Sequence, residues 1–183
     1  MGTRVSFVVR HPDPRWARMA IEEAMGLVLN VHAAMTLHDE SPLTHLNRRA
    51  AQRAIDVPLS VLDVLVASAK VHVESEGVFD PSIRSGEASM SDLEIDVANR
   101  KVAYHHPSLS MDLNGIAKGY AVDVASDHLR SLGIEHFIVN AGGDLYVAGD
   151  AGDGKPGWRV HLVSDKTVGW RLSDRAIATS GNG

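Results

Sequence analysis

The sequence predicts an α+β fold in which mixed or antiparallel sheets pack against helices. Three segments repeat apolar residues at the spacing of an α-helix, and several shorter segments alternate apolar and polar residues as strands do. Turn signals between neighbouring strand segments predict hairpins. Helices and strands do not alternate strictly along the chain, which disfavours a doubly wound parallel sheet.

The first residues are predicted to form a strand, a helix and a loop. Residues 3–9 alternate apolar and polar side chains, which predicts a strand. Asp13 and Pro14 mark a helix start, because Asp caps the first turn and Pro fits its first position, and an apolar stripe follows over residues 17–29. Residues 36–47 are polar, include a proline and lack periodicity, so we expect a loop there.

A second helix is expected after Pro58, with Ser60 as a candidate cap and Gly77 as its C-terminal stop. Residues 82–91 follow as a predicted loop, and residues 109–113 are predicted to form a strand. A third helix is expected from Gly115 to Gly133.

Two hairpins are predicted, each from two short apolar segments around a turn signal. Their strands cover residues 95–97 with 101–104, and residues 137–139 with 145–148. A glycine-rich loop at residues 150–157 precedes the last two strands, at residues 158–163 and 175–178. No linker or internal repeat interrupts this pattern, so residues 1–183 are expected to form one domain.

Composition excludes several classes of function. The net charge is −5 with acidic and basic residues interspersed, and 5% of residues are aromatic, so no nucleic-acid surface is expected. The absence of cysteine excludes disulfides, zinc–thiolate sites and thiol nucleophiles. No apolar run reaches the roughly 20 residues of a membrane span. No signal peptide is visible, so the chain as given is expected in the cytoplasm, or anchored to a membrane or exported if a leader has been removed.

Residues 111–120 form the segment best suited to binding a phosphate. The segment passes from a predicted strand through a glycine turn into a helix, and the N–H groups at a helix N-terminus bind anions. Lys118 in the first turn adds a cation, and Asp112 is placed to hold a ribose, a base or a cation. The alternative is a tight turn in which Asp112 caps the helix and Lys118 is solvated. The segment lacks the glycine spacing of the P-loop and of the dinucleotide-binding fold.

Three other segments have purely structural alternatives. The paired glycines of residues 140–144 suit either close approach to a ligand or a plain hairpin turn. Residues 77–81 favour a turn, and residues 178–181 favour a strand end, because no His or Asp lies nearby to activate a Thr or Ser nucleophile. None of the ten histidines has the spacing of a common metal-ligand motif.

Six segments follow one another in an order that spans the chain: residues 1–3, 41–48, 77–82, 112–119, 140–144 and 178–181. The first precedes a strand, and the second is similar to Ser-x-(Leu/Ile)-(Ser/Thr)-x-(Leu/Phe)-Asn. The other four look like Gly-x-Phe-Asp-(Pro/Ile)-(Thr/Ser), Asp-Leu-x-(Gly/Ala)-Ile-Ala-Lys-Gly, Asn-x-Gly-Gly-Asp and Ala-Thr-Ser-Gly. One such match carries little weight, but the ordered set resembles the FAD:protein FMN transferase (ApbE) family.

The resemblance implies an ApbE-like, T-fold-like architecture and a flavin chemistry. Enzymes of this family bind FAD with Mg²⁺ and cleave its pyrophosphate, and FMN passes to a Thr hydroxyl of a partner flavoprotein as a phosphoester, with release of AMP. By position, the residues that would contact FAD are Met1, His38, Val78, Phe79, Asp80, Asp112 and Lys118. Gly115 would offer its backbone carbonyl to Mg²⁺, a hard ion that takes oxygen ligands, and no catalytic residue is assigned.

The chain departs from the family pattern at two positions and at its end. The family often carries an aromatic residue in place of His38, and Ser82-Ile83-Arg84 replaces the usual Thr-Val-Gly after Pro81. The family continues past Thr-Ser-Gly with a His-containing segment and an Asp-x-x-x-Thr stretch that completes the Mg²⁺ site. We therefore expect the chain to be an N-terminal portion with a half-built metal site, showing weak or no transfer activity by itself.

Two alternatives to a transferase remain open. Some enzymes of the family hydrolyse FAD to FMN and AMP instead. A non-catalytic protein that binds or carries flavin would leave FAD intact.

Overall fold

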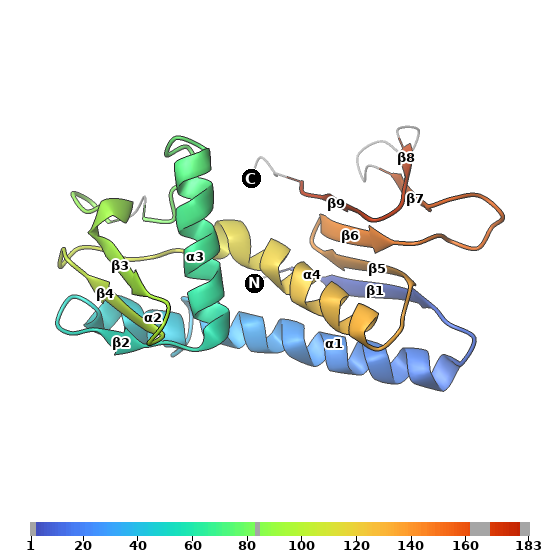
Figure 1. The fold of residues 1–183 in the computed structure, drawn as a ribbon, viewed down its shortest axis with the longest axis horizontal. Coiled ribbons are helices and arrows are strands. Elements are labelled where there is room, and N and C mark those ends of the chain that lie inside the picture. The colour runs from blue at the N-terminus through green and yellow to red at the C-terminus, as the bar shows by residue number, and fades with distance from the viewer. Residues whose placement is uncertain (1–2, 83–84, 162–168, 180–183) are drawn as a thin grey trace. The chain divides into compact units, whose positions relative to one another are not determined.

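The computed structural model describes residues 3–82, 85–161 and 169–179 (Figure 1). The chain divides into two compact units, and each is described by itself. Unit 1 comprises the described residues within Asn30–Ala117, and unit 2 comprises those within Gly2–Leu29 and Lys118–Gly183. The α+β class predicted from the sequence is confirmed, because every paired strand described is antiparallel and helices accompany the sheets.

Unit 1 contains a three-stranded antiparallel sheet with the strand order β2-β4-β3. The strands are β2 (Ile55–Asp56), β3 (Leu93–Asp96) and β4 (Lys101–Tyr104), and the helices are α2 (Pro42–Arg49), α3 (Leu59–Glu74) and the short 3-10 helix η1 (Met90–Asp92). The predicted β3–β4 hairpin is confirmed, and Arg100 in its turn has a positive φ of 54°. Helix α3 runs beside this sheet (Figure 1) and buries Val61, Val64 and Leu65 completely.

The ends of α3 agree only partly with the prediction. Pro58 is the N-cap and no side chain caps the helix, so the candidate cap Ser60 lies inside the first turn. The predicted C-terminal stop at Gly77 is confirmed to within a few residues, because α3 ends at Glu74. Its φ is +81°, a backbone conformation that glycine adopts without strain, and its N–H donates to the carbonyl of His72 at 2.8 Å.

The loop predicted for residues 36–47 is wrong over its second half, where α2 forms. Ser41 caps this helix, because its hydroxyl accepts the Thr44 N–H at 3.1 Å and the Thr44 hydroxyl accepts the Ser41 N–H at 2.8 Å. Leu43 and Leu46 are fully buried. Eight residues are too few to display a helical period, so the capping residues were the available signal.

The strand predicted for residues 109–113 does not form, although alternate side chains of this segment are apolar and buried as in a strand. Leu109, Met111 and Leu113 are almost completely buried. The backbone, however, pairs with side chains and not with a neighbouring strand. The Asn47 amide donates to the Met111 carbonyl and accepts the Met111 N–H, both at 2.9 Å, and the Ser85 hydroxyl pairs with the carbonyl and N–H of Ser110 at 2.9 and 2.8 Å.

Asn47 is itself held by a buried phenol. The Tyr104 hydroxyl donates to the Asn47 side-chain oxygen at 2.8 Å, and burial raises the pKa of Tyr104 well above its usual value. The Asn47 side chain therefore joins α2, β4 and the extended segment at Met111 within unit 1.

Unit 2 contains a four-stranded antiparallel sheet with the strand order β1-β5-β6-β9, visible in Figure 1. Its strands are β1 (Val5–Arg10), β5 (His136–Ala141), β6 (Asp144–Ala148) and β9 (Arg175–Ile177). The strands predicted at residues 3–9, 137–139, 145–148 and 175–178 are thereby confirmed to within a few residues. Phe137, Val139 and Val147 point inward and are fully buried.

A second, two-stranded sheet of unit 2 pairs β7 (Trp158–His161) with β8 (Gly169–Leu172). The strand predicted for residues 158–163 is confirmed to His161, and its last two residues lie outside the described part of the chain. Strand β8 was not predicted, because only its two apolar residues alternate and nothing in the sequence marks its partner.

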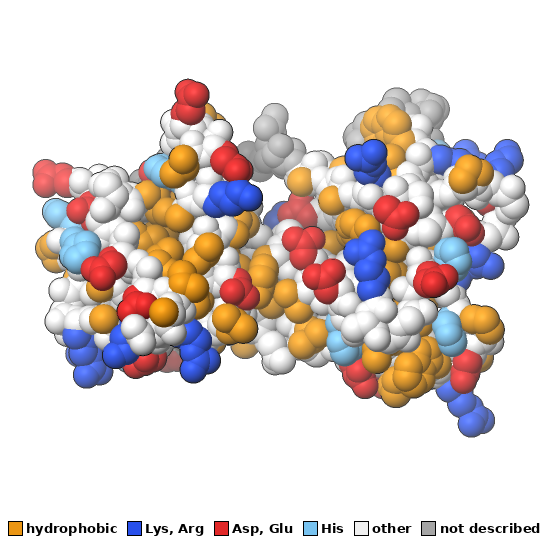
Figure 2. Space-filling view, in the orientation of Figure 1, with side chains coloured by type: hydrophobic (Ala, Val, Ile, Leu, Met, Phe, Trp, Pro, Cys, Tyr) orange, Lys and Arg blue, Asp and Glu red, His pale blue; other side chains and the backbone are white. Residues whose placement is uncertain are grey.

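Two long helices cross the unit boundaries along the chain: α1 (Pro14–Met35) and α4 (Asn114–Ser131). Asp13 caps α1 as predicted, since its carboxylate accepts the Arg15 N–H at 2.8 Å. Gly133, with φ of +76°, follows the end of α4 as predicted. Within the described residues, no helix is both long enough and apolar enough to span a bilayer. On the face shown in Figure 2, acidic and basic side chains are interspersed.

We predict that Asn47→Ala lowers the free energy of unfolding by about 2–4 kcal/mol, because three hydrogen bonds to its amide are lost at once. Urea unfolding followed by circular dichroism measures the loss. Amide hydrogen exchange at Met111 should also accelerate in this variant.

Gln52→Ala is the matched control, because Gln52 is also an amide of unit 1 but is exposed and has a 3.4 Å contact with Arg49. It should change stability by less than about 0.5 kcal/mol. Equal stability of the two variants would contradict the assigned role of Asn47.

Candidate functional site

Two of the six motif segments meet in unit 1. The Asp112 N–H donates to the Pro81 carbonyl at 2.8 Å, which joins residues 77–82 to the start of α4. The Phe79 ring lies against Gly115, since a Cβ added there would sit 3.2 Å from Phe79 Cε2. We call Phe79, Asp80, Asp112 and Gly115 the Asp112 cluster.

The turn that carries Phe79 and Asp80 is held from both sides. The Phe79 carbonyl lies 2.8 Å from His72 Nδ1, and the Phe79 N–H donates to the Ser75 hydroxyl at 3.0 Å. Asp80 Oδ1 accepts the N–H and the hydroxyl of Ser82 at 2.8 and 2.6 Å. These bonds fix the backbone of Phe79 and leave its half-buried ring beside Gly115.

The start of α4 is built by Asp112 and Leu113. Asp112 Oδ1 accepts the Asn114 N–H at 3.0 Å, and the Leu113 carbonyl accepts the Ala117 N–H at 2.8 Å. Asp112 therefore satisfies one of the N–H groups that a helix start leaves without a helical partner. The alternative in which Asp112 caps this helix is confirmed. The cap does not exclude ligand binding, because a carboxylate has two oxygens and several acceptor positions.

Lys118 is not simply solvated, so that part of the alternative is wrong. Its ammonium lies 3.2 Å from Asp144 Oδ2, and the two side chains are 30% and 16% exposed. The Thr179 N–H donates to Asp144 Oδ1 at 3.4 Å, and the Thr179 hydroxyl donates to the Gly143 carbonyl at 3.1 Å. We call Lys118, Asp144, Gly143 and Thr179, all in unit 2, the Lys118 cluster.

The glycines of residues 140–144 make the hairpin turn between β5 and β6. Gly142 and Gly143 have φ of 64° and 101°, and the Gly143 N–H donates to Asn140 Oδ1 at 2.9 Å. A Cβ on Gly142 would overlap the Thr3 side chain at 1.8 Å. The predicted hairpin turn therefore forms, and it also places Asp144 beside Lys118.

Three predicted FAD contacts lie outside these clusters. His38 is exposed, and its backbone N–H donates to the Thr36 hydroxyl at 3.3 Å. Val78 is 90% exposed. Met1 lies outside the described residues. The structure thus groups Phe79, Asp80 and Asp112, whereas the side chains of His38 and Val78 are exposed.

A Mg²⁺ ion takes several hard oxygen ligands in near-octahedral geometry. Among the described residues, no three His, Asp or Glu side chains converge to hold a metal ion. The oxygen donors that are present in the Asp112 cluster also bind the protein's own N–H and O–H groups, as Asp80 does with Ser82. The described side chains therefore gather no cluster of three metal ligands, and the Gly115 carbonyl stays a predicted ligand.

The described carboxyl groups whose pKa is clearly shifted belong to neither cluster. The Asn99 side chain lowers the pKa of Asp96 at the end of β3, and Arg171 lowers that of Asp153. Burial, followed by the charge of Asp127, raises the pKa of Asp123 on α4. Shifted carboxyls therefore do not mark the site here.

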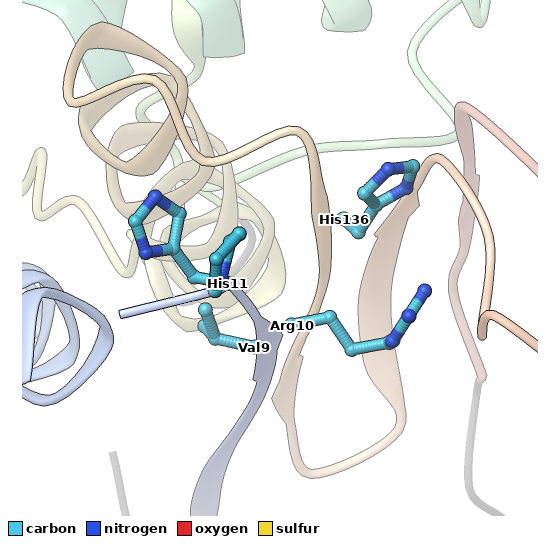
Figure 3. A pocket seen from close by; sticks show the side chains of 5 residues that line it. Val9, Arg10, His11 and His136 are labelled. Carbon is cyan, nitrogen blue, oxygen red and sulfur yellow. The ribbon is translucent and has the colours of Figure 1, made fainter. Parts of the chain in front are cut away.

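A cavity of about 550 Å³ lies at the far end of the β1–β5 ladder from the Asn140–Asp144 turn. It is lined by Val9, Arg10, His11, Pro12 and His136 (Figure 3). His11 is turned away from Arg10 and His136 in this view. Asp150 interacts with both Arg10 and His136. Arg10 pairs with Asp150 at 3.4 Å, and the Asp150 N–H donates to His136 at 3.0 Å. No predicted site residue lines this cavity.

Sequence reasoning missed two residues that organise the clusters, Asn47 and Asp144. Both belong to motif segments, but each acts on a residue far away in the chain, at Met111 and Lys118 respectively. Local spacing carries no signal for such a pairing.

Comparison with known proteins places these segments in one family. The family model described as "ApbE family" matches residues 1–86 and 86–183. A FAD:protein FMN transferase of Vibrio cholerae serotype O1 is 27% identical over 177 residues, covering 80% of this chain and 53% of that protein. One of Haemophilus influenzae is 22% identical over 192 residues, covering 88% and 55%. The chain thus spans about half the length of these curated relatives.

Solved structures agree in fold. The flavin transferase ApbE of Vibrio cholerae superposes with a TM-score of 0.86 at 25% identity, covering 100% of this chain and 69% of that one. The ApbE protein of Thermotoga maritima gives a TM-score of 0.86 at 24% identity, covering 99% and 68%. The ApbE-like architecture predicted from the motifs is confirmed, and the match of the family model over both halves of the sequence shows that this chain belongs to the ApbE family.

Proposed function

We propose that the protein is a flavin transferase that binds FAD and transfers FMN to a Thr hydroxyl of a target flavoprotein, releasing AMP. One observation carries the proposal: the six motif segments occur in order in a chain that the ApbE family model matches from end to end. Relatives named FAD:protein FMN transferase support it. The chain spans about half the length of those relatives, and we propose that it shares their transferase activity.

The proposed reaction is a displacement at phosphorus. The Thr oxygen forms a bond to the phosphorus of the FMN half, and the bond from that phosphorus to the bridging oxygen breaks. AMP leaves with the electron pair, and the Thr proton passes to a base. Catalysis of such a step rests mainly on positioning and on stabilising negative charge.

The chain's own residues suit the binding part of this reaction. Lys118 supplies a cation for a phosphate, and the first N–H groups of α4 favour an anion. The Phe79 ring offers an apolar face, and Asp80 and Asp112 offer acceptors for N–H or O–H groups of FAD. His38, Val78 and Met1 are further proposed contacts that rest on the resemblance.

The proposed reaction requires Mg²⁺, and the Gly115 carbonyl is one of its expected ligands. When bound, it would neutralise charge on the phosphates. The described residues hold no cluster of three His, Asp or Glu side chains for it.

The transfer reaction is tested by incubating the protein with FAD, Mg²⁺ and a candidate acceptor flavoprotein, and by weighing the acceptor by mass spectrometry. A mass gain of one FMN together with AMP release supports transfer. Release of FMN and AMP without the mass gain indicates hydrolysis, and intact FAD in a bound state indicates a binding protein.

We predict that Asp112→Ala weakens FAD binding roughly tenfold or more, because a charge-assisted acceptor is lost. Flavin fluorescence titration measures the affinity. Asp112→Asn keeps an oxygen for the Asn114 N–H and should retain the fold, so weaker binding by both variants would assign the effect to the charge. Unchanged affinity in both variants would remove Asp112 from the proposed site.

Gly115→Ala should weaken FAD binding a few-fold without unfolding the protein. The added Cβ sits 3.2 Å from Phe79 Cε2, so the ring must shift. Gly26→Ala in α1 is the control, because nothing lies within 4 Å of its added Cβ. The control should gain up to about 1 kcal/mol from helix propensity and bind FAD as the parent does. Equal FAD affinity of the two variants would show that the position of Phe79 is irrelevant.

A further inference from the structure

The Lys118 cluster contains a carboxylate that is mostly withdrawn from water. The Asp144 side chain is 16% exposed, and its two oxygens face the Lys118 ammonium at 3.2 Å and the Thr179 N–H at 3.4 Å. A charge removed from water needs a partner of opposite sign. Lys118 is that partner.

The position of Asp144 is fixed by the sheet. It is the first residue of β6, which is paired on one side with β5 and on the other with β9. The turn before it is determined by Gly142 and Gly143 and closed by the bond from the Gly143 N–H to Asn140. The carboxylate therefore starts from a rigid backbone.

Lys118, by contrast, ends in an ammonium on a flexible four-carbon stem. Holding such a side chain in one orientation costs up to about 2 kcal/mol of conformational entropy. A partner fixed on β6 orders the stem before any ligand arrives. An ammonium has three N–H donors, and one directed at Asp144 leaves two for other acceptors.

We propose that Asp144 is a positioning residue, whose carboxylate holds the Lys118 ammonium so that its remaining donors meet the diphosphate of a bound nucleotide. The inference rests on the proposed function only in naming FAD as the nucleotide. Binding of the diphosphate group can be tested without knowing which nucleotide carries it. Asp144 acts through Lys118 and has no assigned contact with the ligand.

The direction of the effect distinguishes this role from simple electrostatics. Removing a negative charge beside Lys118 would by itself strengthen the binding of an anion. Loss of positioning would weaken it. Asp144→Asn is suited to the test, because the amide oxygen can still accept the Thr179 N–H while the ion pair is lost.

The experiment titrates inorganic pyrophosphate, and separately FAD, into the parent protein, Asp144→Asn, Lys118→Ala and the double variant by isothermal calorimetry. Asp144→Asn is expected to weaken both ligands roughly tenfold. Combined with Lys118→Ala, it should have no further effect, whereas a purely structural role would weaken binding in both backgrounds. Asp150→Asn is the matched control, because it removes a paired carboxylate from the other end of the same sheet, and it should bind as the parent does.

Circular dichroism checks that each variant is folded. If Asp144→Asn fails to fold, Asp144→Glu replaces it, because it keeps the charge but moves the carboxylate, and it should also weaken binding. Equal or tighter pyrophosphate binding by the folded variant would overturn the proposal, as would a parent protein that does not bind pyrophosphate. A parent that binds pyrophosphate through Lys118 but not FAD would overturn the proposed function alone.

Discussion

The functional part of this chain depends on how the backbone of residues 109–113 is held. Its N–H and carbonyl groups need partners, because the apolar side chains of Leu109, Met111 and Leu113 draw it into the core. Asn47 and Ser85 supply those partners as a strand would, each bonding both groups of one residue. The place where this segment ends determines where α4 begins. It therefore determines the positions of Asp112 and Gly115 as well.

The sequence predicted those elements whose signals are local and long. Helices α1, α3 and α4 repeat their apolar stripe over several turns, and the hairpins combine apolar segments with a turn signal between them. Helix α2 was missed because it is too short to show a period. The sequence predicts a strand at residues 109–113 because burial of alternate side chains looks the same whether the backbone pairs with a strand or with side chains. Only the partner at Asn47 distinguishes the two, and it lies far away in the chain.

The same limit applies to the candidate site. Its motif segments were identifiable because they occur as an ordered set, and the structure brings two of them together where the Asp112 N–H meets the Pro81 carbonyl. What the sequence left open was the state of each polar group. Asp112 proved to cap α4, and Lys118 proved to be paired with Asp144, so both side chains are already ordered before a ligand is present. Pre-ordered polar groups lose less entropy when they bind a ligand.

The proposed function requires that the start of α4 binds the phosphates of FAD. Hydrogen exchange of the backbone amides, measured with and without saturating FAD, tests it most directly, because an anion bound at a helix N-terminus protects the amides of the first turn. We predict slower exchange in residues 113–118 with FAD and no change in the β3–β4 hairpin of unit 1. Unchanged exchange at the start of α4, in a protein shown to bind FAD, would contradict it.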